Sequence, residues 1–293
     1  MFNPRNLLLS LALSAFAASA SAGSLVYAEN GFQFGTVDLA SGAFNPIGPG
    51  TPEGVTGLAH GPNGSLLTLS FSGNLESIDP NNGAVSIAGA TGLGDCSLLT
   101  SPCGPTSANT IAALGGKFYA TDYQNKLYAL NPLTGATTPI GLTGMPGITF
   151  VPLSTNPDES FNIFDEAFFA ADGKLYATFD TGTVDTATFT GTPVIDAKLY
   201  QIDPATGVAT LIGPTAFGLT GAVEVNGTTY AFNAPLGEVD ALDLATGKTN
   251  FVSNLDPAAG FITGAVPTPE PASIALAAIG IIGFAVCRRR RHA

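Results

Sequence analysis

The stretch Lys198–Gly213 reads KLYQIDPATGVATLIG, and its pattern is found five times along the chain. An apolar strand leads into a turn from Asp203 to Gly207, and a second apolar strand then ends at Gly213. The side chain of the Asp can cap the turn, and Gly tolerates the positive φ that short hairpin loops require. The recurrence predicts a repeat protein built from β-hairpins.

Five turns align on this pattern. They are Asp38–Gly42, Asp79–Gly83, Asn131–Gly135, Asp203–Gly207 and Asp243–Gly247. Their first residues are separated by 41, 52, 72 and 40 positions. The two longer spacings indicate insertions, although the spacing of 72 would also accommodate an additional partial blade.

Each turn is accompanied by two further apolar segments. Small residues dominate a presumed inner strand, as in Val55–Ala59, Ile111–Leu114, Ala167–Ala170, Leu219–Val223 and Ile262–Val266. A strand with an aromatic residue follows, as in Lys117–Ala120, Lys174–Ala177 and Thr228–Ala231. Four strands in about 40 to 50 residues is the period of a β-propeller blade.

The two ends of the repeat region complement one another. Ser24–Ala28 matches the aromatic strand but has no inner strand before it, whereas Phe261–Val266 is an inner strand with nothing after it. Joining the two would complete one blade and remove the free sheet edges. We therefore predict an all-β fold with one propeller over residues 23–266. Five blades are preferred, and six or seven are the alternatives.

The charge of the chain restricts its partners. Charged residues are only 11% of the sequence, with 36 Gly and 21 Pro, as expected of short strands joined by many turns. Between Arg5 and Arg288 there are five Lys against all 22 Asp and Glu, a net charge of −17. Such a surface repels phosphate backbones, so nucleic acid is not an expected partner, whereas cations and neutral glycans are.

The N-terminus has the features of an export signal. Arg5 precedes an apolar run from Leu7 to Ala18, and Ala20-Ser21-Ala22 supplies small residues at the cleavage positions. We expect residues 1–22 to be a signal peptide that is read by the Sec export machinery.

The C-terminus, residues 267–293, is organised as a sorting or anchoring segment. Sixteen uncharged residues from Ala272 to Cys287 would form a helix of about 24 Å, which is short for a bilayer core of about 30 Å. Arg288, Arg289, Arg290 and Arg291 follow and would stay on the cytoplasmic side. Both ends thus place the repeat region outside the cytoplasm.

This C-terminal arrangement resembles the PEP-CTERM sorting signal of Gram-negative bacteria. Pro269, Glu270 and Pro271 match its motif, ahead of the hydrophobic helix and the basic cluster. The resemblance implies recognition by an exosortase, a membrane transpeptidase that cuts near the motif. It also implies an inner-membrane-anchored intermediate that passes to the cell surface or to an exopolysaccharide matrix. An anchor that is never cut is the alternative.

The repeats are similar to bacterial propellers of the YVTN and quinoprotein type. The shared feature is Leu-Tyr-x-Ile/Leu-Asp-Pro-x-Thr-Gly, as in Leu199–Gly207. This chain contains no Trp and so lacks the docking signature of those families. That difference argues against a quinone cofactor.

Two groups of residues are candidates for a disulfide and a metal site. Cys96 and Cys103 would pair after export and close the loop between Asp95 and Pro105. Four carboxylates, Asp158, Glu159, Asp165 and Glu166, supply the oxygen ligands that calcium prefers. The alternative for this acidic loop is a solvated surface. No other cofactor is expected.

No set of residues forms a recognisable catalytic motif. His60 is expected to lie in a loop, and no G-x-S-x-G elbow accompanies it. We therefore predict a non-enzymatic surface protein whose propeller binds or scaffolds another molecule, with exopolysaccharide as one candidate. The alternative is a hydrolase or lyase for matrix polysaccharide or lactones, in which Glu53, Asn109, Asp165 and Glu166 would converge.

Overall fold

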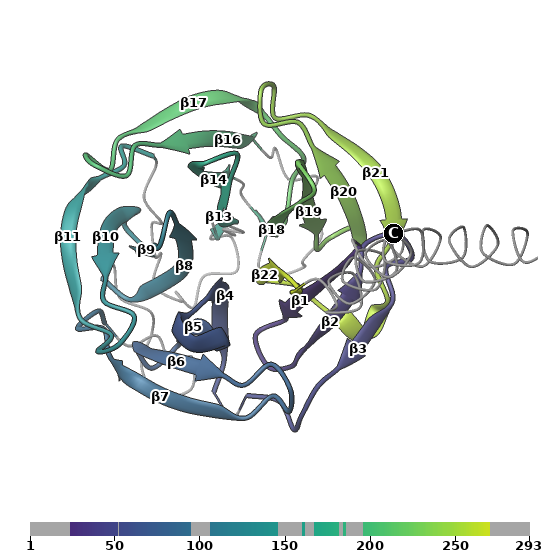
Figure 1. The fold of residues 1–293 in the computed structure, drawn as a ribbon. Helices are drawn as coiled ribbons and strands as arrows, with labels where there is room; N and C mark the ends of the chain where they lie inside the picture. Colours follow the sequence, from purple (N-terminus) through teal and green to yellow (C-terminus); the bar gives the residue numbers. More distant parts are fainter. Residues whose placement is uncertain are drawn as a thin grey trace, which may run out of the picture. The chain divides into compact units, whose positions relative to one another are not determined.

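A computed structural model describes residues 24–51, 53–94, 106–145, 160–161, 167–181, 184–185 and 196–269. The chain divides into two units, Val26–Pro267 and the two ends, Met1–Leu25 with Thr268–Ala293. In the first unit, five four-stranded antiparallel sheets surround one axis as the blades of a propeller (Figure 1). The prediction of an all-β propeller with five blades is confirmed.

Four blades are contiguous in the sequence, and their strands run outward from the axis in chain order (Figure 1). Blade 2 contains β4 (Val55–His60), β5 (Leu66–Ser70), β6 (Asn74–Ile78) and β7 (Val85–Ala90). Blade 3 contains β8 (Ala108–Leu114), β9 (Lys117–Asp122), β10 (Lys126–Leu130) and β11 (Thr137–Leu142). Blade 4 contains β13 (Phe168–Ala171), β14 (Lys174–Thr181), β16 (Asp196–Ile202) and β17 (Ala209–Pro214). Blade 5 contains β18 (Leu219–Val225), β19 (Thr228–Asn233), β20 (Glu238–Leu242) and β21 (Thr249–Asn254).

The remaining blade, which we call the closing blade, is built from both ends of the propeller unit. It contains β22 (Gly264–Pro267), β1 (Leu25–Glu29), β2 (Phe34–Asp38) and β3 (Phe44–Pro46). The register of β1 and β22 aligns Val26 with Pro267 and Glu29 with Gly264. The predicted closure is therefore confirmed. The inner strand begins at Gly264, later than the expected Ile262.

The spacing of 72 residues reflects longer connections within blade 4 and before it. The additional residues fall between β11 and β13 and between β14 and β16. Two short strands in these connections, β12 (Ser160–Phe161) and β15 (Val184–Asp185), pair with each other as a separate sheet. In the part of the chain that the structure describes, the extra length thus adds a two-stranded sheet and no partial blade.

The five repeated turns have the conformation expected from their sequence. Their last residues, Gly42, Gly83, Gly135, Gly207 and Gly247, have φ between 70° and 82°. At the first position, the side chain accepts a hydrogen bond from the backbone N–H two residues later, as Asp203 does from Ala205 at 2.9 Å. The Asp and Asn residues of these turns are therefore structural.

The hydrophobic core consists of five clusters of buried residues, each between two neighbouring blades. Between blade 5 and the closing blade, for example, Phe232 packs in one cluster with Val26 and Ile262. Each fully buried apolar side chain of this size contributes about 1.5 to 3 kcal/mol. Since the ring has five such interfaces, its stability depends on closure as much as on any single blade.

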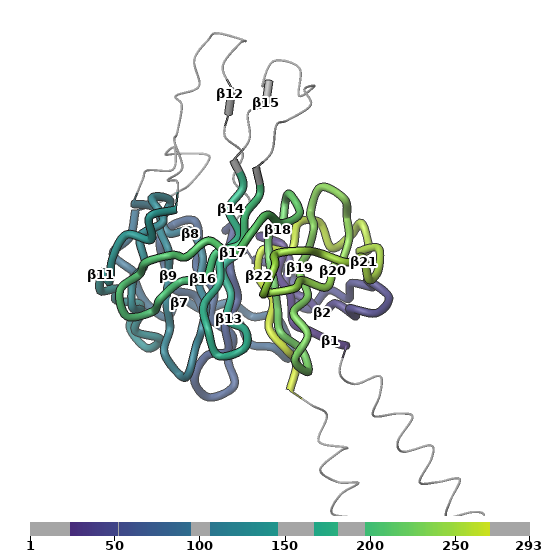
Figure 2. Tube along the Cα trace, turned by 90° about the horizontal axis from the view of Figure 1, so that it is seen from above, coloured from purple at the N-terminus to yellow at the C-terminus, as the bar shows by residue number. Residues whose placement is uncertain are grey.

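Because neighbouring strands of each blade run in opposite directions, successive turns lie on two opposite faces of the propeller. The turns between third and fourth strands lie on one face, which we call the turn face, together with the turns that follow the inner strands. The connections between blades leave from the opposite, loop face. In the side view, β22 ends at the turn face, whereas β14 runs to the loop face (Figure 2). None of the residues that the structure describes forms a helix long and apolar enough to cross a membrane.

Candidate functional site

A central channel opens on the turn face, with walls from the inner strands β4, β8, β13, β18 and β22. Its cavity is about 330 Å³. Small side chains contribute much of its lining, among them Ala59, Ala112, Ala170, Ala222 and Ala265. Small residues are needed because the strands converge: a Cβ on Gly264 would collide with the backbone nitrogen of Leu58. The small-residue pattern of the inner strands thus reflects packing at the axis.

Polar groups are concentrated at the mouth of this channel. His60, Glu224 and Asn226 lie there. His60 is the last residue of β4, and not a loop residue as expected, and its Nε2 is 2.8 Å from the carbonyl oxygen of Pro267. Glu224 is half-buried and accepts a hydrogen bond of 2.5 Å from the backbone N–H of Asp172.

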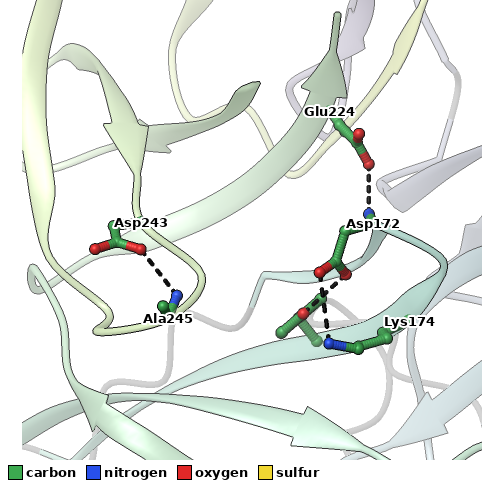
Figure 3. A network of polar contacts seen from close by, with 6 residues as sticks. Asp172, Lys174, Glu224, Asp243 and Ala245 are labelled. Atoms are coloured by element: carbon green, nitrogen blue, oxygen red, sulfur yellow. Dashed lines mark hydrogen bonds and ion pairs between the residues drawn. The ribbon is translucent and has the colours of Figure 1, made fainter. Parts of the chain in front are cut away.

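Asp172 connects the channel mouth to a groove of about 660 Å³ between blades 4 and 5 (Figure 3). It lies in the tight turn between β13 and β14 with φ of 44°, a conformation that Asp tolerates better than most residues. The hydroxyl of Tyr176 donates to its Oδ1 at 2.9 Å, and the Nζ of Lys174 is 3.5 Å from its Oδ2. The other residues lining the groove are Gln201, Ile212, Gly227, Thr228, Thr229, Leu242, Asp243, Leu244 and Ala245.

Two titrating side chains of this groove, Tyr176 and Asp243, have shifted pKa values that keep each in one protonation state. Burial raises the pKa of Tyr176, and the hydrogen bond to Asp172 and the charges of Asp172 and Glu224 raise it further. Tyr176 therefore stays neutral and acts as a donor. On the other wall, the Thr246 hydroxyl and the Ala245 N–H lower the pKa of Asp243, so this carboxylate stays ionised. The groove thus combines hydrogen-bond donors with charged acceptors.

A second groove, of about 530 Å³, lies beside blade 3 on the same face. Lys117, the first residue of β9, occupies the place that Lys174 has in β14. Its lining is more apolar and includes Phe118, Leu130, Leu133 and Ile140. No carboxylate is among the described residues that line it. The two grooves therefore have similar geometry but different chemistry.

A buried carboxyl group lies in the closing blade, where β1 pairs with β22. Glu29 is fully buried at the end of β1. Its carboxyl oxygens accept hydrogen bonds from the Thr263 hydroxyl and, at 2.7 Å, from the Gly31 N–H. Burial outweighs these bonds and raises the pKa of Glu29 to about 8. Burial likewise raises the pKa of Glu76 and of Asp240, each also beside another carboxylate.

Most of the residues singled out in the sequence lie outside the described part of the chain. These are Cys96, Cys103, Asp158, Glu159, Asp165, Glu166, Glu270, Pro271 and Arg288–Arg291. Pro269 is described and exposed. Glu53 precedes β4 of blade 2, whereas Asn109 lies in β8 of blade 3. Within the described ranges, no three His, Cys, Asp or Glu side chains form a group that could hold a metal ion.

The residues of the groove were not predicted. A weak signal existed in Asp172-Gly173-Lys174, where Asp-Gly before a strand marks a tight turn. Nothing in the sequence, however, indicates that Glu224 of the next blade meets this turn, because the contact joins residues 52 positions apart.

Comparison with known proteins identifies the C-terminal segment. Residues 267–291 match the PEP-CTERM protein-sorting motif. The motif implies that the protein is exported, processed by an exosortase and sorted to the cell surface. No curated protein matches the sequence.

Solved structures with a similar strand arrangement share little sequence with this chain. A nidogen/laminin complex aligns with a TM-score of 0.47 and 13% identity, covering 83% of this chain and 97% of that chain. Virginiamycin B lyase from Staphylococcus aureus aligns with a TM-score of 0.41 and 13% identity, covering 78% of this chain and 65% of that chain. PQQ-bound aldose sugar dehydrogenase from Streptomyces coelicolor also aligns with a TM-score of 0.41 and 13% identity, covering 75% of this chain and 86% of that chain. At this identity, no ligand or reaction is transferred to this chain.

Proposed function

We propose that this protein is a cell-surface binding module whose propeller holds a glycan of the exopolysaccharide matrix in the groove between blades 4 and 5. The observation that carries the proposal is the network in which Asp172 links Glu224, Tyr176 and Lys174 (Figure 3). It holds acceptors and donors in place on a surface open to solvent.

The chemistry of the groove suits a sugar. Sugar hydroxyls both donate and accept hydrogen bonds, and the lining offers carboxylates, an ammonium group and the hydroxyl of the exposed Thr228. The partly exposed side chains of Ile212 and Leu244 provide apolar surface for the C–H faces of a ring. Because the chain carries a net charge of −12, we expect a neutral glycan.

The test is binding of the mature protein to neutral and anionic matrix polysaccharides on an array, followed by calorimetry. Lys174→Ala should weaken binding about tenfold, because it removes the charged donor of the groove. Lys117→Ala is the matched control, since Lys117 has the equivalent place in the more apolar groove of blade 3. Equal effects of the two changes, or binding of anionic polysaccharides only, would refute the assignment.

Several other features belong to the same proposal. We propose that residues 272–287 form the transmembrane helix of an inner-membrane intermediate in a Gram-negative bacterium. We also propose a disulfide between Cys96 and Cys103, which a mass shift on reduction would test. Calcium at Asp158, Glu159, Asp165 and Glu166 is testable by calorimetry on the wild-type protein and on Asp165→Ala.

A further inference from the structure

The second groove, beside blade 3, has the same layout as the groove between blades 4 and 5. In blade 3, Ala129 of β10 pairs with Tyr119 of β9, and in blade 4, Gln201 pairs with Tyr176 in the same way. The next blade contributes its repeated turn to each groove, through Pro204 of blade 4 in one case and through the turn of blade 5 in the other. The two grooves are therefore equivalent, position by position.

Both carboxylates of the Asp172 network are missing from the second groove. In the turn before the second strand, Asp172 of blade 4 corresponds to Gly115 of blade 3. On the facing blade, Glu224 of blade 5 corresponds to Ala170 of blade 4. A glycine and an alanine thus occupy the positions of the two acids.

This loss leaves a lysine and a tyrosine of the second groove without acidic partners. In blade 4, Asp172 accepts from the Tyr176 hydroxyl and pairs with Lys174. Among the residues that the structure describes, neither Lys117 nor Tyr119 has a hydrogen-bond or ion-pair partner for its side chain. Burial alone raises the pKa of Tyr119, so its hydroxyl stays neutral and is a donor. Lys117 is exposed.

The carboxylate nearest in sequence to the lining is already engaged elsewhere. Asp203 precedes Pro204, and it accepts from the Ala205 N–H at 2.9 Å and from the Thr206 hydroxyl at 2.8 Å within its own turn. The net charge of −12 lowers the affinity of the chain for any anion. At physiological ionic strength, however, exposed charges more than about 8 Å away are largely screened. The local ammonium group of Lys117 therefore decides which ligand the second groove prefers.

We propose that the second groove binds the carboxylate group of an acidic sugar. The Lys117 ammonium group and the Tyr119 hydroxyl donate to this carboxylate, and bonds of this kind to an ionised group are stronger than neutral ones. Leu133 and Ile140, in the same lining, pack against the C–H face of the ring. This site goes beyond the proposed function, which assigns a neutral glycan to the groove between blades 4 and 5.

The backbone beneath the second groove favours a sugar over an extended peptide. Its floor is formed by β9 and β10, and each of these strands is paired on both sides within blade 3. A peptide that binds by strand addition needs a free sheet edge, which this floor does not offer. Recognition here depends on side chains, as a sugar acid requires.

The experiment is calorimetry on the mature protein purified from its host, at an ionic strength of about 0.15 M. The probes are a galacturonate trisaccharide and its neutral methyl ester, and the ester should bind at least tenfold more weakly. Lys117→Ala should weaken binding of the acid about tenfold, and Tyr119→Phe about threefold. Lys248→Ala is the control, because it removes the same charge from an exposed turn outside both grooves, and it should leave binding unchanged.

A pair of variants at Gly115 tests the missing carboxylate directly. Gly115 has φ of 58°, and an added Cβ would meet no atom within 4 Å. Asp172 and Asn226 occupy the equivalent position in blades 4 and 5, with φ of 44° and 53°, so both residue types fit this turn. Gly115→Asp should weaken binding of the acid at least tenfold, because the new carboxylate pairs with Lys117. Gly115→Asn has the same size without the charge and should retain binding.

The outcomes separate this site from its alternatives. Absence of binding by the acid, or equal binding of the acid and the ester, would overturn the proposal. Equal losses in Lys117→Ala and Lys248→Ala, or full binding by Gly115→Asp, would also overturn it. An acidic peptide that displaces the trisaccharide with equal affinity would refute the assignment to a sugar. Because Lys174→Ala with a neutral glycan reports on the other groove, this proposal and the proposed function can fail independently.

Discussion

The closing blade and blade 5 share short sequences in their first two strands but differ there at the buried position of Glu29. Their inner strands read Ile262-Thr-Gly-Ala-Val266 and Leu219-Thr-Gly-Ala-Val223, and their second strands end in Tyr27-Ala-Glu-Asn30 and Tyr230-Ala-Phe-Asn233. In this alignment Glu29 takes the place of Phe232, and both side chains are fully buried.

The difference concerns the contact that joins the two ends of the propeller unit in the closing blade. In blade 5, the hydroxyl of Thr220 donates to the carbonyl oxygen of Ile262 at 2.6 Å, across the interface to the closing blade. In the closing blade, the corresponding Thr263 donates to the Glu29 carboxyl group. Blade 5 thus has an apolar residue at this position, whereas the blade formed from both ends joins them by a buried polar contact.

The largest effect is expected from removing the strand that makes the closing blade different. A chain that ends at Phe261 loses Ile262 and the strand β22 with Val266, and these two buried side chains contribute about 1.5 to 3 kcal/mol each. It also leaves the edge of β1 unpaired. The melting temperature, measured by circular dichroism, should fall by more than about 10 °C. A chain that ends at Pro267 is the control, and equal melting of the two would show that closure contributes little.

The next effect concerns the pH dependence of stability. The carboxyl group of Glu29 loses its proton near pH 8 when folded, because burial raises its pKa from an ordinary value of 4.5. The folded state therefore holds a proton that the unfolded state has released, and stability should fall as pH rises from about 4.5 to about 8. Glu29→Gln mimics the protonated form and should remove this decline, with a gain of a few kcal/mol at pH 8.

Denaturant unfolding at several pH values measures this effect. Phe232→Leu in blade 5 serves as the control, because it removes packing but no titrating group. It should lower stability equally at all pH values. If Glu29→Gln shows the same slope against pH as the wild type, Glu29 is not the group responsible.

The smallest effect concerns the perimeter contact between these two blades. The turn residue Gly42 of the closing blade lies against the backbone of Asn254, at the end of β21, and its carbonyl accepts from the Asp256 N–H at 2.9 Å. Gly42→Ala should combine the strain of positive φ with a steric clash. Gly227→Ala, in a blade 5 turn with φ of 77° and open space around it, should show the strain alone.

Thermal unfolding of the two glycine variants separates these contributions. Gly227→Ala should cost about 1 kcal/mol, and Gly42→Ala about 1 to 3 kcal/mol more. Similar costs for both would mean that the turn of the closing blade can move away from β21 without loss of stability.

Much of the fold follows from local features of the sequence. The repeated turn is specified by Asp or Asn at its start and Gly at its end, since these residues satisfy the backbone and permit positive φ without distant partners. The blade period follows from the spacing of these turns. The incomplete segments Ser24–Ala28 and Phe261–Val266 were enough to predict closure, because each lacks what the other supplies.

The candidate site was decided by the tertiary structure. The contact of Glu224 with Asp172 and that of His60 with Pro267 join different blades, and no local pattern records which turns meet across a blade interface. The same holds for Glu29: its sequence neighbours are those of an ordinary strand, and only ring closure buries it against Thr263. Local conformation is encoded by neighbouring residues, whereas burial and the convergence of side chains arise only when the ring is assembled.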